Sequence, residues 1–209
     1  LRSMWERGWS FIKKAGTIIL LSTIFVWFTS RFGWLDGQFG MLEEDQISAS
    51  ILAKIGNAIA WIFAPLGWGN WQATVASITG LVAKENIVGT LGVLYSGGAG
   101  TVYDAIAAAF NGITGYSFLV FNLLCAPCFA AMGAIKREMN SAKWFWFAIG
   151  YECGFAYVIA LIVNQLGKLF TGDVNVFGLI VAILAIALII YMLVRPYKES
   201  NKLDVKVKA

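Results

Sequence analysis

VFGLIVAILAIALIIYMLV (Val176–Val194) contains no charged residue and is about as long as a helix that crosses a bilayer. Such a helix needs about 20 apolar residues to span the hydrocarbon core. The rest of the chain has the same character, because only 13% of its 209 residues are charged and 59% are hydrophobic. Soluble domains carry about 25% charged residues. The sequence therefore predicts an integral membrane protein.

Three further stretches are long and apolar enough to cross a bilayer, or nearly so: Ala15–Ser30, Tyr116–Ile135 and Trp144–Leu166. Ile51–Ala64 is shorter and is either a short span or an amphipathic helix at the membrane surface. Lysines and arginines cluster before the first span, between residues 135 and 144, and after the last span. By the positive-inside rule, we expect a multi-pass protein of the cytoplasmic membrane with its N-terminal end and C-terminal tail in the cytoplasm. This clustering indicates topology, and we expect no nucleic acid as a partner.

The stretch GLVAKENIVGTL (80–91) places Lys84, Glu85 and Asn86 consecutively in an apolar run. Charged groups within a bilayer are costly unless they find partners. Irregular backbone at membrane depth is tolerated only where protein or a water-filled cavity surrounds it. We therefore expect a broken or re-entrant helix within 71–95, in an all-α polytopic transmembrane fold.

The stretch NLLCAPCFAAMGAIKRE (122–138) combines ligand types that suit soft or borderline transition metals. Pro127 leaves the Leu123 carbonyl without its usual helical partner. A freed carbonyl beside two thiols could hold a cation transiently. Cysteine and methionine also pack as ordinary hydrophobic residues, so both interpretations stay open. If the stretch is one helix, the residues on a shared face are Asn122, Cys125, Cys128 or Phe129, and Met132.

Glu152 lies near the middle of the predicted span Trp144–Leu166. An ionisable residue at that depth indicates a functional site, with a protonated structural carboxyl as the alternative. Gly150 and Gly154 form a GxxxG motif, which predicts a closely packed neighbouring helix. The residues on a face roughly 100° from Glu152 are Cys153, Tyr157 and Asn164.

Two blocks, GLVAKENIVGTLGVLY (80–95) and the stretch 121–165, resemble the C-terminal half of the ferrous iron transport protein B (FeoB) family. The first resembles the family's A-K-E-x-V-V-G-T-L signature, and the second resembles its second Gate motif. FIKKAGTIILLSTIFVWF (11–28) also resembles the family's entry into this region. The resemblance implies a transmembrane Gate domain over 1–196, followed by a polar cytoplasmic tail over 197–209. Because the chain opens at Leu1, we expect it to be a fragment of a longer protein.

The resemblance also implies a function and partners. Family members couple an N-terminal GTP-binding domain to a membrane domain that passes Fe2+ into the cytoplasm. No G-x-x-x-x-G-K-[ST] motif occurs in this sequence, so GTP and Mg2+ would bind only in that other domain and this part would not be an enzyme. The implied partners are the lipid bilayer, the G domain of the same polypeptide, a small accessory Feo protein and further copies in a homo-oligomer.

Carried over by position, the Gate cysteine of the family is Cys128. Several residues depart from the family pattern, namely Cys125, Asn86, Glu152 and Cys153. Transport sites bind their ion weakly and in series, so we expect transient ligands along a path. The metal-ligand candidates, in order, are Cys128, Cys125, Glu85, Glu152, Asn122 and Met132.

Other functions remain open from the sequence alone. A Gate-type carrier of a nucleoside or another small solute would show aromatic and amide contacts around a ring-sized pocket. An intramembrane thiol oxidoreductase would use Cys125 and Cys128 as a redox pair. A scaffold for a partner subunit would need neither the thiols nor Glu85.

Overall fold

The computed structural model describes residues 2–35, 38–81, 84, 86–95, 101–172 and 175–195. These residues are helical apart from a small hairpin and turns, which confirms the predicted all-α class. The α-helices are α1 (Arg2–Arg31), α2 (Ile51–Ala60), α3 (Trp71–Gly80), α4 (Asn86–Leu94), α5 (Val102–Ala109), α6 (Gly112–Leu124), α7 (Phe129–Met139), α8 (Ala142–Thr171) and α9 (Val176–Val194). The other elements are the 3-10 helices η1 (Glu44–Ala49) and η2 (Trp61–Leu66) and the strands β1 (Phe32–Leu35) and β2 (Gln38–Met41). The predicted tail at 197–209 lies outside the described residues.

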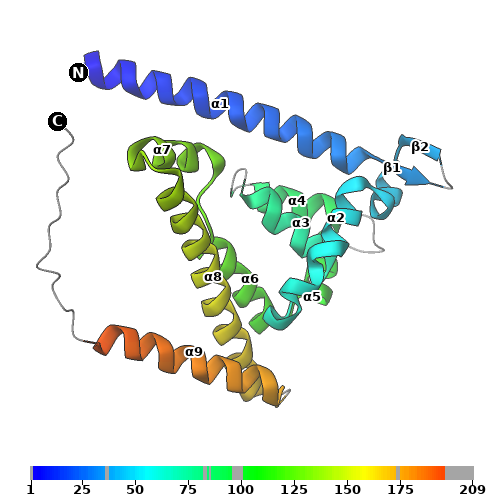
Figure 1. Ribbon diagram of the computed structural model, residues 1–209. Coiled ribbons are helices and arrows are strands. Elements are labelled where there is room, and N and C mark those ends of the chain that lie inside the picture. Colours follow the sequence, from blue (N-terminus) through cyan, green and yellow to red (C-terminus); the bar gives the residue numbers. More distant parts are fainter. Residues whose placement is uncertain are drawn as a thin grey trace, which may run out of the picture.

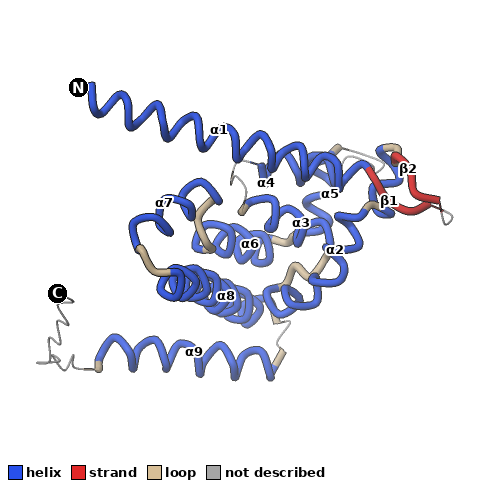
Figure 2. The backbone as a smooth tube through the Cα atoms, turned by 45° about the horizontal axis from the view of Figure 1, so that its top comes forward, coloured by secondary structure: helices blue, strands red, loops and turns tan. Residues whose placement is uncertain are grey.

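The long helices frame the molecule. In Figure 1, α1 and α9 lie on opposite sides, and α8 runs between them and joins α9 at one end. Figure 2 views α8 nearly end-on, with α6 on one side of it and α9 on another. With 30 residues, α8 is about 45 Å long, which exceeds the hydrocarbon thickness of about 30 Å.

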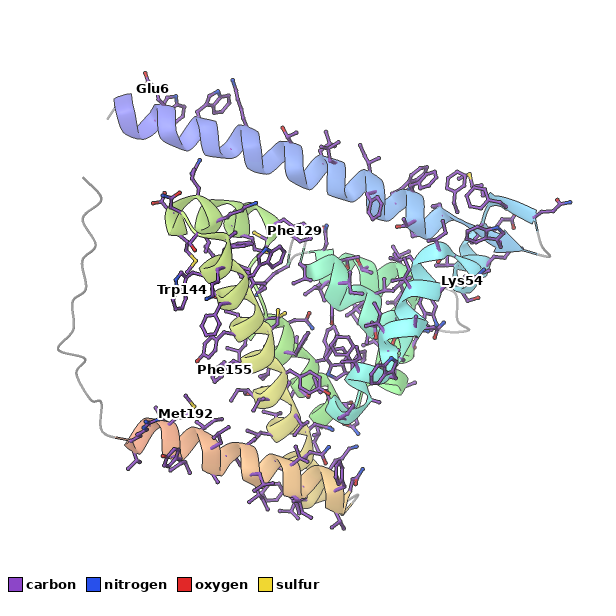
Figure 3. All side chains as sticks on the ribbon, viewed as in Figure 1. Glu6, Lys54, Phe129, Trp144, Phe155 and Met192 are labelled. Carbon is purple, nitrogen blue, oxygen red and sulfur yellow. The ribbon has the colours of Figure 1, made fainter. Side chains whose placement is uncertain are left out.

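The apolar surface of the outer helices suits lipid. Among the described helices, α8 and α9 are each long and apolar enough to cross a membrane, which supports the predicted spans at Trp144–Leu166 and Val176–Val194. Only 6% of the apolar window of α9 is buried. Trp144 and Phe155 extend from the side of α8 that faces away from α6 (Figure 3). Helix α1 covers the predicted Ala15–Ser30 span without a break, and its crossing stays a prediction.

Two sharply bent helix pairs make up much of the remaining chain. The segment 51–66 (α2 and η2) meets α3 at 95°, and α5 meets α6 at 94°. At the first bend, Pro65 lies within η2 and Gly67 adopts a left-handed backbone conformation with φ of 92°. Proline removes a helical donor and glycine tolerates a positive φ, so together they turn the chain. Each pair is either one broken span or a re-entrant loop, which leaves the choice for Ile51–Ala64 open.

The predicted break within 71–95 is confirmed, because α3 ends at Gly80 and α4 begins at Asn86. The prediction of one continuous span over Tyr116–Ile135 is wrong. Helix α6 ends at Leu124, and α7 begins only at Phe129. The physical reason is Pro127, which lacks an N–H and disfavours helical backbone in the residue before it.

Aromatic rings form the core where η2, α6 and α8 meet. Trp68 is almost fully buried and stacks on Phe63 with a centroid distance of 4.5 Å. Phe118 and Phe121 of α6 contact the same indole at 5.1 and 5.4 Å. The alanines of α8 that are fully buried in this core, and so permit close helix packing, are Ala156 and Ala160.

The predicted packing at Gly150 and Gly154 is wrong for the described residues. A Cβ added to either glycine would meet no atom within 4 Å. Close packing of α8 occurs instead just beyond the motif, at Ala156 and Ala160. The sequence also gave no sign of the hairpin, in which Phe32 pairs with Met41.

Candidate functional site

The two helix breaks contact each other. One lies between α3 and α4, and the other lies between α6 and α7. The backbone N–H of Phe129, the first residue of α7, donates to the carbonyl oxygen of Leu81 at 3.1 Å. Discontinuous helices that meet inside a membrane protein are the usual setting for ion and substrate sites in transporters. We therefore take this junction as the candidate site.

Lys84 places its ammonium group on the C-terminal end of α6. Its Nζ donates to the carbonyl oxygens of Asn122, Leu123 and Cys125 at 2.9, 3.0 and 3.2 Å. The last carbonyls of a helix have no intrahelical donor and carry partial negative charge. A cation is the natural partner for such a group of oxygens. The charged residue of one break thus satisfies the backbone of the other.

This contact revises the interpretation of the freed carbonyl. The sequence predicts that Pro127 leaves the Leu123 carbonyl free for a cation, and a cation does occupy it. That cation is the ammonium of Lys84, which the sequence analysis did not assign to this position. Two features of the sequence could have predicted this contact. They are a lone lysine in one helix break and, in the other, a carbonyl that proline leaves without a helical donor.

Two thiols lie beside this group of carbonyls. Cys125, at the end of α6, has its Sγ 3.6 Å from the Sγ of Cys153 on α8. Cys128 is at the N-cap position of α7, where its side chain makes no capping hydrogen bond. The predicted shared helical face from Asn122 to Met132 is wrong, because the helix ends before Cys125. The thiol partner of Cys125 is therefore on another helix, 28 residues away in sequence.

Glu152 is half-buried beside Cys153 on α8. Its Oε2 atom is buried and has no hydrogen-bond partner among the described residues. A buried polar atom without a partner carries a desolvation penalty of about 1–3 kcal/mol, or more if charged. This cost is consistent with a functional role for the Glu152 carboxyl.

The structure describes two of the three remaining metal-ligand candidates. Asn122 is 8% exposed, and its Nδ2 donates to the carbonyl of Phe118 one turn earlier at 2.8 Å. Met132 packs, half-buried, against a small apolar cluster that includes Phe145. Both side chains thus have packing roles, and metal binding by either stays a prediction. Glu85 lies outside the described residues.

Polar side chains of α6 and α8 hold the carbonyls of η2, which lack the regular α-helical ladder. The Tyr157 hydroxyl donates to Ile62 at 2.7 Å, and the Asn164 amide donates to Pro65 at 2.9 Å. Ser117 is fully buried, and its hydroxyl lies 3.0 Å from the Leu66 carbonyl. Cys153, Tyr157 and Asn164 all contact the broken helices, which is consistent with the face that the sequence predicts they share. Ser117 was not predicted from the sequence.

A separate cavity of about 290 Å³ lies between α1, α2, α3 and α4. Its lining includes the ring of Trp27, the amide of Asn86 and the hydroxyls of Thr79 and Thr90, which lie 3.1 Å apart. None of the thiols lines it. This volume is at the small end of the range for small-molecule sites.

The chemistry of the junction follows from these contacts. Among the described residues, no three Cys, Asp or Glu side chains gather where they could hold a metal ion. The junction instead offers two neighbouring thiols and three carbonyl oxygens. Such a partial set suits weak, transient binding, as passage through a membrane requires.

Comparison with known proteins identifies the family. The profile of the Gate family, described as "Nucleoside recognition", matches residues 12–142. The chain is 41% identical over 172 residues to the Fe(2+) transporter FeoB of Methanocaldococcus jannaschii, which covers 81% of this chain and 25% of that protein. It is 35% identical over 169 residues to the Fe(2+) transporter FeoB of Staphylococcus aureus, which covers 81% of this chain and 24% of that protein.

A third relative is the Fe(2+) transport protein A/Fe(2+) transporter FeoB fusion protein of Porphyromonas gingivalis, with 28% identity over 80% of this chain and 25% of that protein. No solved structure matches. The chain spans about a quarter of the length of these relatives. Because the profile matches well over half of the residues, the chain belongs to the Gate family, with the Gate region of the FeoB transporters as its counterpart.

Proposed function

We propose that this chain is the C-terminal membrane part of a ferrous iron importer. The similarity to Fe(2+) transporters over four-fifths of the chain supports Fe2+ as the cargo. The single structural observation that carries the proposal is the junction of two broken helices, where carbonyl oxygens and two thiols lie together. The ion is moved and not chemically changed, so this part acts as a conduit.

The path through the junction uses the thiols first. Cys125 and Cys153 bind Fe2+ as a pair, and Cys128 binds it at the start of α7. Thiolates suit a borderline cation such as Fe2+ and discriminate against Mg2+ and Ca2+, which prefer oxygen. Glu152, Glu85, Asn122 and Met132 are the further candidates along the same path.

The wider assembly follows from the relatives. We infer that a G domain on the same polypeptide binds GTP and Mg2+ and regulates transport through this membrane part. The fusion of an A protein to FeoB in one relative supports a small accessory Feo protein as a partner. The protein resides in the cytoplasmic membrane with both ends of this chain in the cytoplasm, and a homo-oligomer is part of the proposal.

The test is uptake of radiolabelled Fe2+ by cells that express the full-length protein. Single Cys125→Ser, Cys153→Ser and Cys128→Ser variants are compared with wild type and with Glu85→Gln at equal expression. Loss of uptake in Cys125→Ser and Cys153→Ser supports the thiol pair. Wild-type uptake in every variant would contradict the ligand assignment, and no Fe2+ uptake by the wild type would contradict the function.

The cavity between α1 and α4 favours a second candidate. It has the aromatic ring and amide that a carrier of a small polar solute requires, in Trp27 and Asn86. Uptake of radiolabelled uridine that is lost in Asn86→Leu, with Fe2+ uptake absent in the wild type, would favour this function over iron import.

A further inference from the structure

The ammonium of Lys84 occupies a position that would suit a free cation. Three backbone oxygens converge on its Nζ at 2.9–3.2 Å, and all three belong to the C-terminal end of α6. We propose that these oxygens form a cation site that Lys84 fills at rest, and that a transported divalent cation enters by displacing the ammonium. This inference rests on the proposed function and adds a gating residue to it.

The oxygens are available to a cation because of the helix break and not because of Lys84. Pro127 has no N–H to donate to the Leu123 carbonyl, and Cys125 already has extended backbone with ψ of 163°. Backbone carbonyls that replace the hydration shell of an ion are a known means of cation selection in channels. Divalent cations bind oxygen at about 2.0–2.6 Å, so such an ion would draw the same carbonyls inward.

Lys84 is placed to leave as well as to bind. It stands between α3 and α4 and belongs to neither helix. Its side chain is only half-buried, and lysine has a flexible stem with a compact charge. A tethered ammonium of this kind can withdraw without unfolding a helix.

The thiol pair explains what the displacement would achieve. Cys125 contributes one of the three carbonyls and also one of the two sulfur atoms that lie 3.6 Å apart. A cation that takes the place of Lys84 is therefore adjacent to a soft donor pair. When the ion leaves, the Lys84 ammonium returns to the three carbonyl oxygens and again neutralises their partial negative charge. The occupied site then opposes back-flow of the ion.

The direct test is cation binding to the purified full-length protein, with Mn2+ detected by electron paramagnetic resonance as an ion that remains divalent in air. If Lys84 leaves its site in about one molecule in ten, its removal should tighten binding about tenfold. Lys84→Met should therefore bind Mn2+ about tenfold more tightly than wild type, and Lys84→Arg should not. Lys54→Met is the matched control, because the Lys54 ammonium lies over the Trp34 ring, 4.8 Å from its centroid. Unchanged or weaker binding in Lys84→Met would overturn the proposal.

A measurement on the wild type covers the case in which Lys84→Met fails to fold. Acetylation by an amine-reactive ester, followed by peptide mass spectrometry, reports how often each lysine is free. Saturating Mn2+ should raise the acetylation rate of Lys84 several-fold and leave that of Lys54 unchanged. A rate for Lys84 that does not respond to Mn2+ would also overturn the proposal.

Failure of the two proposals can be told apart. If the wild type imports Fe2+ but Lys84→Met binds Mn2+ no more tightly, the gating role is wrong and iron import stands. If Lys84→Met binds more tightly but the wild type imports no Fe2+, the cation site stands and the iron function is wrong.

Discussion

Gly67 allows a strict test of how η2 is seated between α6 and α8. It has a left-handed backbone with φ of 92°, and a Cβ at this position would lie 2.6 Å from Oδ1 of Asn164 and 2.7 Å from Cγ2 of Thr114. Gly172 provides the matched control, because its φ is 84° and a Cβ there would meet no atom of the described residues within 4 Å. Alanine at the two positions therefore differs in packing and shares the backbone strain.

The expected magnitudes follow from these contacts. Left-handed backbone costs a non-glycine residue about 1–2 kcal/mol, which is the whole expected effect of Gly172→Ala. In Gly67→Ala, overpacking adds about 1–3 kcal/mol. Asn164 cannot simply rotate away, because its Nδ2 holds the Pro65 carbonyl at 2.9 Å in a bond that contributes about 1 kcal/mol. Gly67→Ala should therefore lower the free energy of unfolding by about 2–4 kcal/mol more than Gly172→Ala.

The assay is thermal unfolding of the purified full-length protein in detergent, followed by intrinsic tryptophan fluorescence. For domains of about 200 residues, 1 kcal/mol shifts the midpoint by about 2–4 °C. The Gly67→Ala midpoint should therefore lie at least about 4 °C below that of Gly172→Ala. Equal midpoints for the two variants would show that α6 and α8 do not enclose Gly67, and would refute this account of the core.

Three further predictions concern the junction itself. Copper(II)–phenanthroline should oxidise the thiols of Cys125 and Cys153 to a disulfide that is lost in Cys153→Ser and kept in Cys128→Ser, because a separation of 3.6 Å needs little movement to reach about 2.05 Å; peptide mapping shows which pair is linked, and a Cys125–Cys128 link would contradict the geometry. Ser117→Ala should lower stability by about 1–3 kcal/mol in the same thermal assay, because it removes the buried hydroxyl that reaches η2, and an unchanged midpoint would count against that role. Glu152→Gln should raise the unfolding midpoint while lowering Fe2+ uptake, because it neutralises a carboxyl that we propose as an ion ligand and whose buried oxygen has no hydrogen-bond partner among the described residues; a lower midpoint would show that the carboxyl is stabilising.

The structural features that could be predicted from the sequence are those whose cause lies within one short stretch of residues. The helices α8 and α9 follow from uninterrupted apolar runs, and the break after Gly80 follows from consecutive polar residues that a continuous lipid-facing helix would not tolerate. These causes lie within one window of residues. The bend at Gly67 also has a local cause in Pro65 and Gly67, but it was not predicted from the sequence.

The errors arose where a contact between distant segments decides the outcome. Treating residues 116–135 as one helix placed Cys125 and Cys128 on a common face, whereas Pro127 ends the helix and Cys125 turns toward Cys153. The GxxxG pattern at Gly150 predicted a helix contact that α8 makes elsewhere. A GxxxG motif permits close packing of a neighbouring helix, but whether a helix packs there depends on the complete fold.

Lys84 shows why the polar residues of the two breaks belong to one structure. A charge inside a bilayer is costly, and so is a helix end without donors. The break between α3 and α4 contains the charge, and the break between α6 and α7 contains the carbonyls without donors. The contact between the Lys84 ammonium and the α6 carbonyls offsets both costs. Because one side of this contact is a lysine with a flexible stem and the other is helix backbone, the ammonium can leave without loss of either helix. That asymmetry is what the proposed passage of an ion through the junction requires.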